Sequence, residues 1–316
     1  MQFAAVKPAF AQARPGIPSL APVPASCYLC GGERLALRHP ARGGGQEPDA
    51  AAYHCTSFAH RSHPPIWGCL ECGLLFQWPR RPEREILREY EEVVDPLYMA
   101  ERENRILTFR RAVRLLGPGR RRRLLDVGAY CGYFLEVARE AGFEAEGLEL
   151  SSWAGGHARE RGFAVHAETL SERARHGAAY DVVTLWDVIE HCADPRRDLE
   201  AALRLLRPGG RLFLATIDAG SLVARLLGSR WPWLMDMHLF YFDRSNLAAL
   251  LEDVGFRVVG RRTYTHTVSA GYLLRKVVAS FPALAPLAGL LRYLVPSRWP
   301  VPVNLGDNML VVAERP

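Results

Sequence analysis

The sequence predicts an α/β protein in which a doubly wound, largely parallel sheet follows a small cysteine-rich domain. Three observations carry this prediction. Residues 123–134, RLLDVGAYCGYF, give an apolar run, a glycine-containing turn and the start of a helical pattern. Strand-like and helix-like segments then alternate as far as residue 315. Two Cys-x-x-Cys pairs precede all of them.

Composition bounds the class of protein. Of 316 residues, 49% are hydrophobic, so a sizeable core is available and wholesale disorder is excluded. The net charge of +6 permits nucleic acid, anionic lipid or phosphorylated partners but selects none of them. Residues 1–26 are rich in Ala and Pro without the apolar region of a signal peptide, which predicts a flexible tail. No uncharged apolar run reaches about 18 residues, so we expect a cytoplasmic protein.

The two cysteine pairs predict a metal site in a small domain at 27–82. A glycine follows each pair and permits the tight turn that aims both thiolates at one ion. Four thiolates are a common tetrahedral set for structural zinc, and a reducing cytosol favours metal over disulfides. We therefore expect a zinc ribbon, with residues 43–50 as an inserted loop. The expected ligands are Cys27, Cys30, Cys69 and Cys72.

Further candidate ligands lie between the pairs. The sequence does not decide whether these side chains support the metal site, contact a substrate or lie at the surface, and we expect none of them to bind zinc. They are His54, Cys55, His60 and His63.

After them, segments 84–94 and 99–116 have the periodicity of two amphipathic helices divided by Asp95-Pro96, which predicts a helical segment over 83–118. Cys131 and Cys192 are expected to be small buried hydrophobes.

The turn after the first strand has the features of a ligand site. A helix N-terminus presents free N–H groups, and glycine lets a ligand approach the backbone. Asp126, Gly128 and Gly132 form D-x-G-x-x-x-G, which lacks the G-x-G-x-x-G spacing of a pyrophosphate site. The alternative is an ordinary strand-to-helix turn without a ligand.

These residues resemble the first motif of class I S-adenosylmethionine (SAM)-dependent methyltransferases, an acidic residue followed by alternating glycines. The resemblance implies that SAM contacts Asp126, Gly128, Ala129, Tyr130 and Gly132. Tyr130 stands where the family has its middle glycine. The loop is therefore expected either to be slightly wider or to place Tyr130 over the ligand.

The resemblance continues in register. Segment 142–150 is expected to be a second strand ending in Glu149, where doubly wound folds place a carboxylate for ribose hydroxyls. A third strand, 162–170, would bring Glu168 or Thr169 to the adenine. Segment 180–195 is expected to be the fourth strand and the loop after it, with Asp187 at the carboxyl edge, where contact with the donor or the loop is expected. Segment 206–218 is expected to close a helix with Pro-Gly-Gly and then start a fifth strand. Strands at 256–265 and 308–315, the last antiparallel, complete a Rossmann-like seven-stranded sheet within 119–316.

Two further segments belong to the predicted methyltransferase domain. Segment 228–243 interleaves Asp236 and His238 with Trp231, Trp233, Phe240 and Tyr241, and it resembles the aromatic segment of zinc-ribbon methyltransferases. We expect a substrate lid there, with core packing as the alternative. Insertion 266–307 is apolar with a few basic residues, which fits a membrane surface, core packing or a homodimer contact.

Methyl transfer is an in-line displacement on a sulfonium, so the protein mainly aligns and deprotonates the acceptor. His191 and His238 are the candidate bases, since imidazole titrates near neutral pH. The alternative for His191 is a loop-stabilising role within the D-x-x-E-H segment.

The resemblance implies a small-molecule, sugar or glycan acceptor. The rival hypotheses are a zinc-ribbon nucleic-acid-binding protein on an inactive methyltransferase fold, and an RNA methyltransferase. We do not expect nucleic acid, because the ribbon lacks a dense Lys/Arg face interleaved with aromatics.

Overall fold

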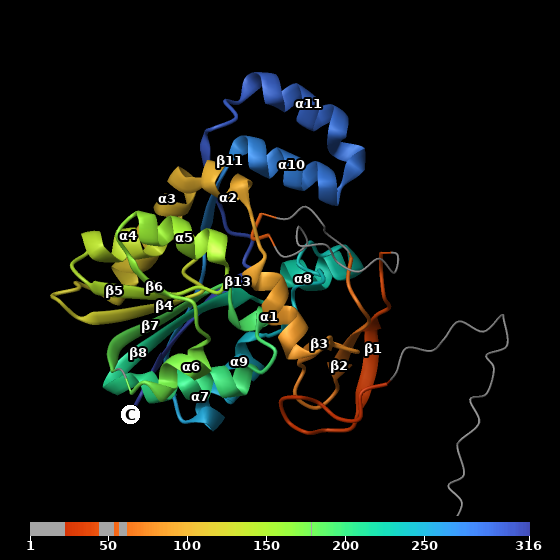
Figure 1. Ribbon diagram of the computed structural model, residues 1–316. Helices are drawn as coiled ribbons and strands as arrows, with labels where there is room; N and C mark the ends of the chain where they lie inside the picture. Colours follow the sequence, from red (N-terminus) through yellow and green to blue (C-terminus); the bar gives the residue numbers. More distant parts are fainter. Residues whose placement is uncertain (1–22, 44–53, 57–61, 178) are drawn as a thin grey trace, which may run out of the picture.

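A computed structural model describes residues 23–43, 54–56, 62–177 and 179–316. Its centre is a seven-stranded sheet in the order β10-β13-β8-β7-β4-β5-β6 (Figure 1). Strands β8, β7, β4, β5 and β6 are parallel neighbours, whereas β13 runs antiparallel between β8 and β10. The strands are β4 (Arg123–Val127), β5 (Glu144–Leu148), β6 (Ala164–His166), β7 (Tyr180–Trp186), β8 (Leu206–Ile217), β10 (Arg257–Thr263) and β13 (Asn308–Glu314). This order confirms the predicted Rossmann-like sheet with an antiparallel last strand.

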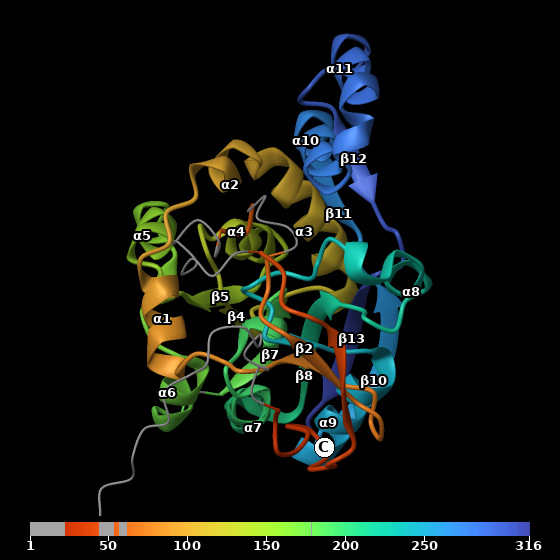
Figure 2. The ribbon, with the colours of Figure 1, turned by 90° about the vertical axis from the view of Figure 1, so that its right-hand side faces the viewer.

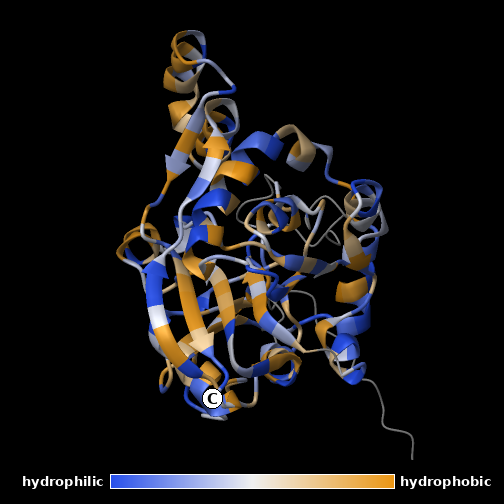
Figure 3. Cartoon of the chain, turned by 90° about the vertical axis from the view of Figure 1, so that its left-hand side faces the viewer, coloured by the Kyte–Doolittle hydropathy of each residue, from blue (hydrophilic) through white to orange (hydrophobic). Residues whose placement is uncertain are grey.

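Helices cover both faces of the sheet (Figure 1). One face carries α3 (Arg102–Leu116), α4 (Tyr133–Glu140) and α5 (Ser152–Glu160), and the other carries α6 (Leu170–Arg175), α7 (Pro195–Leu205) and α9 (Arg244–Val254). Successive strand residues point to opposite faces, so Leu124 packs with the α3 and α4 core while Leu125 packs with the α7 and α9 core. Figure 3 shows apolar residues along the central strands between these layers.

The helical segment before the sheet was predicted as two helices and contains three. They are α1 (Glu83–Glu91), α2 (Pro96–Ala100) and α3. The Asp95-Pro96 division is confirmed, because the Asp95 side chain accepts a hydrogen bond from the Tyr98 N–H and caps α2. Residues Pro208 to Gly210 were expected to lie between helix and strand. They instead belong to β8, where pairing with β7 shifts register between Leu206 and Arg211.

The cysteine-rich segment forms a second, smaller sheet with the order β1-β2-β3-β9. Strands β1 (Leu35–His39), β2 (Ile66–Cys69) and β3 (Leu75–Gln77) come from the predicted ribbon, but β9 (Phe240–Tyr241) comes from the predicted lid. Strand β9 pairs antiparallel with β3, so the ribbon and the methyltransferase domain share a sheet. Much of the predicted tail and of loop 43–50, and His60, lie outside the described residues.

The prediction of a lid at 228–243 requires correction. Trp231, Phe240 and Tyr241 are at most 2% exposed and belong to the hydrophobic core. The indole N–H of Trp231 also donates to the Asp307 carboxylate over 3.0 Å. The segment, which follows α8 (Leu222–Leu227), is therefore a fixed wall of the structure, because burial of these rings opposes any outward swing.

Insertion 266–307 forms a hairpin that projects from the sheet (Figure 2). It contains β11 (His266–Ser269), α10 (Ala270–Ser280), α11 (Ala285–Leu294) and β12 (Pro300–Val303). Core packing holds for the start of α10, where Ala270 and Tyr272 are buried, but α11 exposes Leu287, Leu290 and Leu294. Contact of α11 with a membrane surface or with a second copy of the chain stays a prediction. Among the described residues, no helix combines the length and apolar character needed to cross a membrane.

Candidate active site

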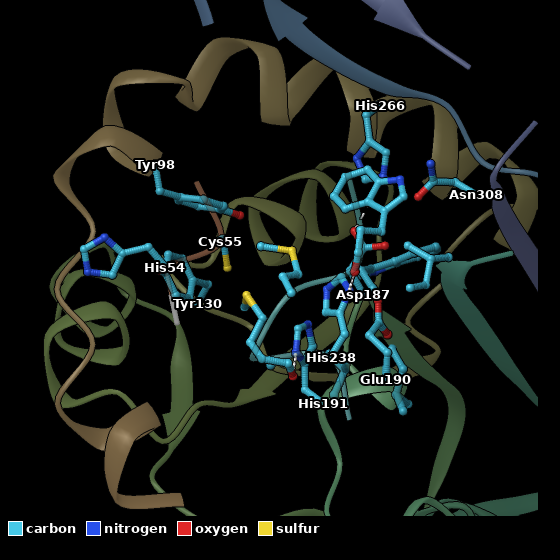
Figure 4. Close-up of a pocket in the computed structure, with 18 of the residues that line it drawn as sticks. His54, Cys55, Tyr98, Tyr130, Asp187, Glu190, His191, His238, His266 and Asn308 are labelled. Atoms are coloured by element: carbon cyan, nitrogen blue, oxygen red, sulfur yellow. Dashed lines mark hydrogen bonds and ion pairs between the residues drawn. The ribbon is translucent and has the colours of Figure 1, made fainter. Parts of the chain in front are cut away.

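A cavity of about 500 Å³ lies at the carboxyl ends of β4, β5 and β7, and residues of α1, α2 and α3 also line it. Ligands of doubly wound sheets bind at this edge. Figure 4 shows Tyr98 and Tyr130 on one side of the cavity and Glu190, His191 and His238 on the other. Of the sequence-predicted site residues, the cavity is lined by Asp126, Gly128, Ala129, Tyr130, Glu149, Glu168, Thr169, Asp187, His191 and His238.

The turn after β4 presents both a carboxyl group and an open backbone to the cavity. Asp126 is 2% exposed and accepts a hydrogen bond of 2.6 Å from the Thr184 hydroxyl. Burial raises the pKa of Asp126 to about 8, against the lowering effect of that bond. Gly128 has φ +68°, and a Cβ there would lie 2.8 Å from Val188 Cγ2. Only glycine therefore fits this position without strain.

Tyr130 replaces a glycine in the resembled motif and keeps a glycine-like backbone, with φ +48°. Its ring packs edge-on to Tyr98 at a centroid distance of 4.4 Å. Its buried hydroxyl has no hydrogen-bond partner within the described residues. Tyr130 thus stands at the cavity wall with an unsatisfied polar group, which a bound ligand can satisfy.

Gly132 lies behind the turn and does not line the cavity. It begins α4 with φ +74°, and a Cβ there would lie 3.0 Å from the Ala158 methyl group of α5. The backbone conformation and the packing of α4 against α5 therefore explain why position 132 is glycine, and close approach of a ligand is not needed to explain it.

Glu149 follows β5 and is held by backbone donors. One carboxylate oxygen accepts from the Tyr130 N–H and the other from the Ser151 N–H, both over 2.8 Å. Burial raises its pKa, although these bonds oppose the change. Each oxygen retains a second lone pair, so the carboxylate can also accept ribose hydroxyls.

The two residues of interest after β6, Glu168 and Thr169, form structural interactions and also line the cavity. Thr169 caps α6 and forms a reciprocal capping box with Glu172. Glu168 forms an ion pair with Arg173 over 3.4 Å. Both residues line the cavity. Contact of either residue with the adenine of SAM stays a prediction.

Asp187 ends β7 in a left-handed backbone conformation, with φ +55°. Its carboxylate lies 3.6 Å from His266 Nε2 of the projecting hairpin (Figure 4). A non-glycine residue in this region is strained by roughly 1–3 kcal/mol, and such strain clusters at functional sites. Asp187 therefore joins the sheet edge to the hairpin at the cavity.

The two predicted histidines lie together, with ring centroids 4.8 Å apart. His191 Nδ1 is 2.9 Å from the Met237 carbonyl, and His238 Nδ1 is 2.8 Å from the Trp233 carbonyl. A ring nitrogen facing a carbonyl must donate, which assigns the lone pair to Nε2 in each neutral imidazole. Burial lowers the pKa of His191, so its neutral form is favoured.

Hydrogen bonds to main-chain carbonyls fix the segment that orients these rings. The Gln77 side-chain amide of β3 donates to the Met235 and Asp236 carbonyls over 2.9 and 3.2 Å. The Leu239 N–H donates to the Glu190 carbonyl over 2.8 Å. The ribbon therefore reaches the cavity wall through Gln77.

Several cavity residues were not assigned to this site from the sequence. Arg105, within α3, faces the cavity, and its Nε has no partner within the described ranges. Trp186 and Tyr264 stack at 5.5 Å between ring centroids. His54 and Cys55, for which the sequence left open a role at the metal site, in substrate contact or at the surface, line this cavity. These residues come together only through tertiary packing.

The four ribbon cysteines converge as predicted. Their sulfur atoms lie within 4.8 Å of one another, with Cys27 and Cys72 3.5 Å apart and Cys30 and Cys69 3.6 Å apart. Sulfurs about 2.3 Å from a tetrahedral zinc lie about 3.8 Å apart. The donor set therefore fits zinc, and among described residues it includes no histidine.

Comparison with known proteins extends this assignment. A family model described as a methyltransferase domain matches residues 99–260, just over half of the chain. The chain is 36% identical over 104 residues to a ubiquinone biosynthesis O-methyltransferase of Aromatoleum aromaticum, covering 31% of this chain and 44% of that protein. A protein of the same name from Ralstonia nicotianae is 28% identical over 178 residues, covering 48% and 75%.

The chain thus spans less than half of the first of these relatives. Among solved structures, it resembles a SAM-dependent methyltransferase of Thermotoga maritima with 19% identity and a TM-score of 0.47, over 68% of this chain and 91% of that chain. The fold assignment rests on the strand order described above and not on this likeness. On the family match and the order of its seven strands, the chain belongs to the methyltransferase domain family and has the class I SAM-dependent methyltransferase fold.

Proposed function

We propose that this chain transfers the methyl group of SAM to an oxygen atom of a small-molecule acceptor. The observation that carries the proposal is that the turn Asp126–Tyr130 and the histidine pair line one cavity. Its volume of about 500 Å³ is typical of small-molecule sites. The names of the relatives support oxygen as the acceptor atom.

The residues present fit SAM. Gly128 leaves backbone open to the cavity, and Glu149 offers carboxylate lone pairs to ribose hydroxyls. Asp126, Glu149 and Asp187 supply carboxyl groups where a positively charged donor binds. Arg105 offers a guanidinium to an anionic group such as the donor's carboxylate. SAM, when bound, supplies the electrophilic methyl group.

The chain's own residues then align and activate the acceptor. We assign activation of the acceptor hydroxyl to His191 and His238, whose Nδ1 atoms are fixed on carbonyls of one wall segment. The acceptor oxygen forms a bond to the methyl carbon as the carbon–sulfur bond breaks, and its electron pair passes to sulfur. The hydroxyl proton passes to the Nε2 of one of these imidazoles.

Sugars and glycans are hydroxyl acceptors and fall within this proposal. A nucleic-acid acceptor is the second candidate. An affinity for RNA that falls steeply with rising salt concentration would favour it. The exposed apolar residues of α11 support contact with a membrane surface or a second copy of the chain. Structural zinc at the four cysteines completes the proposal, because two similar turns aim four thiolates at one point.

The donor assignment predicts different effects for two glycines. Gly128 and Gly177 share φ +68°, so alanine is strained at both, but only Gly128 lines the cavity. We expect Gly128→Ala to lower SAM affinity at least tenfold by calorimetry, since a side chain is added where the ligand needs backbone. Gly177→Ala is the control and keeps wild-type affinity. Equal SAM affinity in both variants would contradict the donor site.

The activation assignment predicts that His238→Ala lowers turnover roughly a hundredfold, as expected for loss of acid–base catalysis, while SAM affinity stays nearly intact. Buried His63 is a matched control: its Nδ1 also lies 2.8 Å from a main-chain carbonyl, but it does not line the cavity. His63→Ala should lower thermal stability and keep turnover per folded molecule. Full turnover per folded molecule in His238→Ala would remove that histidine from the mechanism.

The metal assignment predicts one zinc per chain held by the four cysteines. Cys72→Ser should release this zinc and lower the melting temperature, because metal binding and folding are coupled in such sites. Cys55→Ser, outside the cluster, should retain it. Metal analysis of freshly purified, reduced protein measures both, and an absence of zinc in the wild type would refute the site.

A further inference from the structure

We propose that helix α10 recognises the acceptor, and that Lys276 on this helix binds a carboxylate or phosphate group of the acceptor. The substrate class is then an apolar small molecule that carries one anionic group. The inference rests on the proposed function and specifies which acceptors the cavity admits. It concerns the cavity wall that the projecting hairpin supplies.

The first observation is that one face of α10 lines the cavity. Leu273, Lys276 and Val277 of the helix and Phe281 at its C-terminal end all contribute to the wall. Their spacing of three and four residues places them on one side of a helix. No residue that we assign to SAM lies on the hairpin, so this wall is left for the acceptor.

The second observation is the rarity of lysine in the sequence. The chain has 40 Lys and Arg residues, but lysine occurs only at positions 7 and 276. The one lysine within the described residues therefore lines the cavity, whereas arginine supplies the other basic side chains. Lysine carries a compact ammonium group on an apolar stem, which suits a point contact with an anion among apolar neighbours.

The third observation is an excess of positive charge at this wall. Arg105 of α3 lines the same cavity, and its Nε has no hydrogen-bond partner within the described ranges. Burial and the charge of Arg105 lower the pKa of Lys276 to about 7, although Asp95 opposes the change. An anion beside Lys276 would favour its charged form. SAM brings one carboxylate, which Arg105 can bind, so Lys276 is left for an anion of the acceptor.

The fourth observation is that hydrogen bonds fix the start of α10 to α3. The N–H and the hydroxyl of Ser269, which caps α10, donate to the Glu101 carboxylate over 2.8 and 2.6 Å. The Thr267 N–H donates to the Thr108 hydroxyl over 2.7 Å. These bonds hold the cavity face of α10 in place before any ligand binds, and a preorganised wall loses little entropy on binding.

The chemistry of recognition follows from this wall. An ammonium group donates charge-assisted hydrogen bonds to carboxylate or phosphate oxygens, and these bonds are strengthened where water is partly excluded. Leu273, Val277 and Phe281 can cover the apolar part of the same molecule. A neutral molecule of equal shape would leave the ammonium group without its anion, so the wall selects acceptors by charge.

The test measures equilibrium binding of three probes to the full-length protein by calorimetry. The probes 3-phenylpropionate and 2-phenylethyl phosphate carry the two candidate anions, and 3-phenylpropionamide is their neutral counterpart. Binding is measured with saturating S-adenosylhomocysteine, whose carboxylate occupies the donor site, and again without it. We expect the wild type to bind at least one anion roughly tenfold or more tightly than the amide. The affinities of the two anions decide between carboxylate and phosphate.

Three variants connect this preference to Lys276. Lys276→Met keeps the length and apolar character of the stem but removes the charge, so we expect it to lose the preference for the anion. Lys276→Arg keeps the charge and should retain the preference. Arg275→Met is the matched control, because it removes one charge from the same helix at an exposed position that does not line the cavity. It should behave like the wild type.

Melting temperature and S-adenosylhomocysteine affinity are measured on the same samples, and Lys276→Gln replaces Lys276→Met if the latter does not fold. The proposal is overturned if the wild type binds neither anion more tightly than the amide, or if the folded, uncharged variant retains the preference as Arg275→Met does. A protein that binds S-adenosylhomocysteine without preferring anions retains the proposed function and loses this site. One that prefers anions through Lys276 but does not bind S-adenosylhomocysteine keeps an anion site and loses the proposed function, and the acceptor role with it.

Discussion

The arrangement of the cavity depends on the buried contact between the ribbon and segment 231–242. Strand β9 within this segment pairs with β3, and Gln77 at the end of β3 holds the Met235 and Asp236 carbonyls. The adjacent carbonyls of Trp233 and Met237 orient the two histidines. A side-chain amide in the ribbon therefore fixes the main chain on which both imidazoles depend.

This constraint gives the ribbon a role in the site without any contact with the acceptor. Zinc at the four cysteines would hold the turn before β1 against the turn between β2 and β3, and β3 positions the wall segment. The ribbon and the methyltransferase sheet act as one unit, since Cys27, Cys69 and Leu125 belong to one hydrophobic cluster. Small domains bury limited apolar surface by themselves, so both metal and shared core are expected to stabilise this one.

Much of the fold could be predicted from local sequence patterns. The strand, turn and helix at 123–134 and the glutamate at 149 follow short-range rules of apolar periodicity and spacing, and the structure places Asp126, Gly128 and Glu149 at one edge. The cysteine pairs were equally clear because each is a short local turn followed by glycine. These features need no knowledge of long-range pairing.

The remaining features depend on contacts between distant segments. Nothing local to Phe240 and Tyr241 indicates that they complete the ribbon sheet, so an aromatic run was interpreted as a lid. Glu190 was noted only as the neighbour of His191, and its burial beside His238 appears only once the wall segment is placed. Arg105 on α3 has no motif at all, and Gly132 fits a ligand-binding pattern although helix packing explains it.

The most direct test of this account is turnover of Gln77→Leu, which keeps the approximate size of a side chain that is 2% exposed but removes its amide. Gln77 does not line the cavity, so direct loss of a ligand contact is avoided. The account predicts nearly unchanged SAM affinity and turnover per folded molecule lowered roughly tenfold or more, because displaced carbonyls no longer orient the histidines. Wild-type turnover in the folded variant would contradict the claim that the ribbon positions the site.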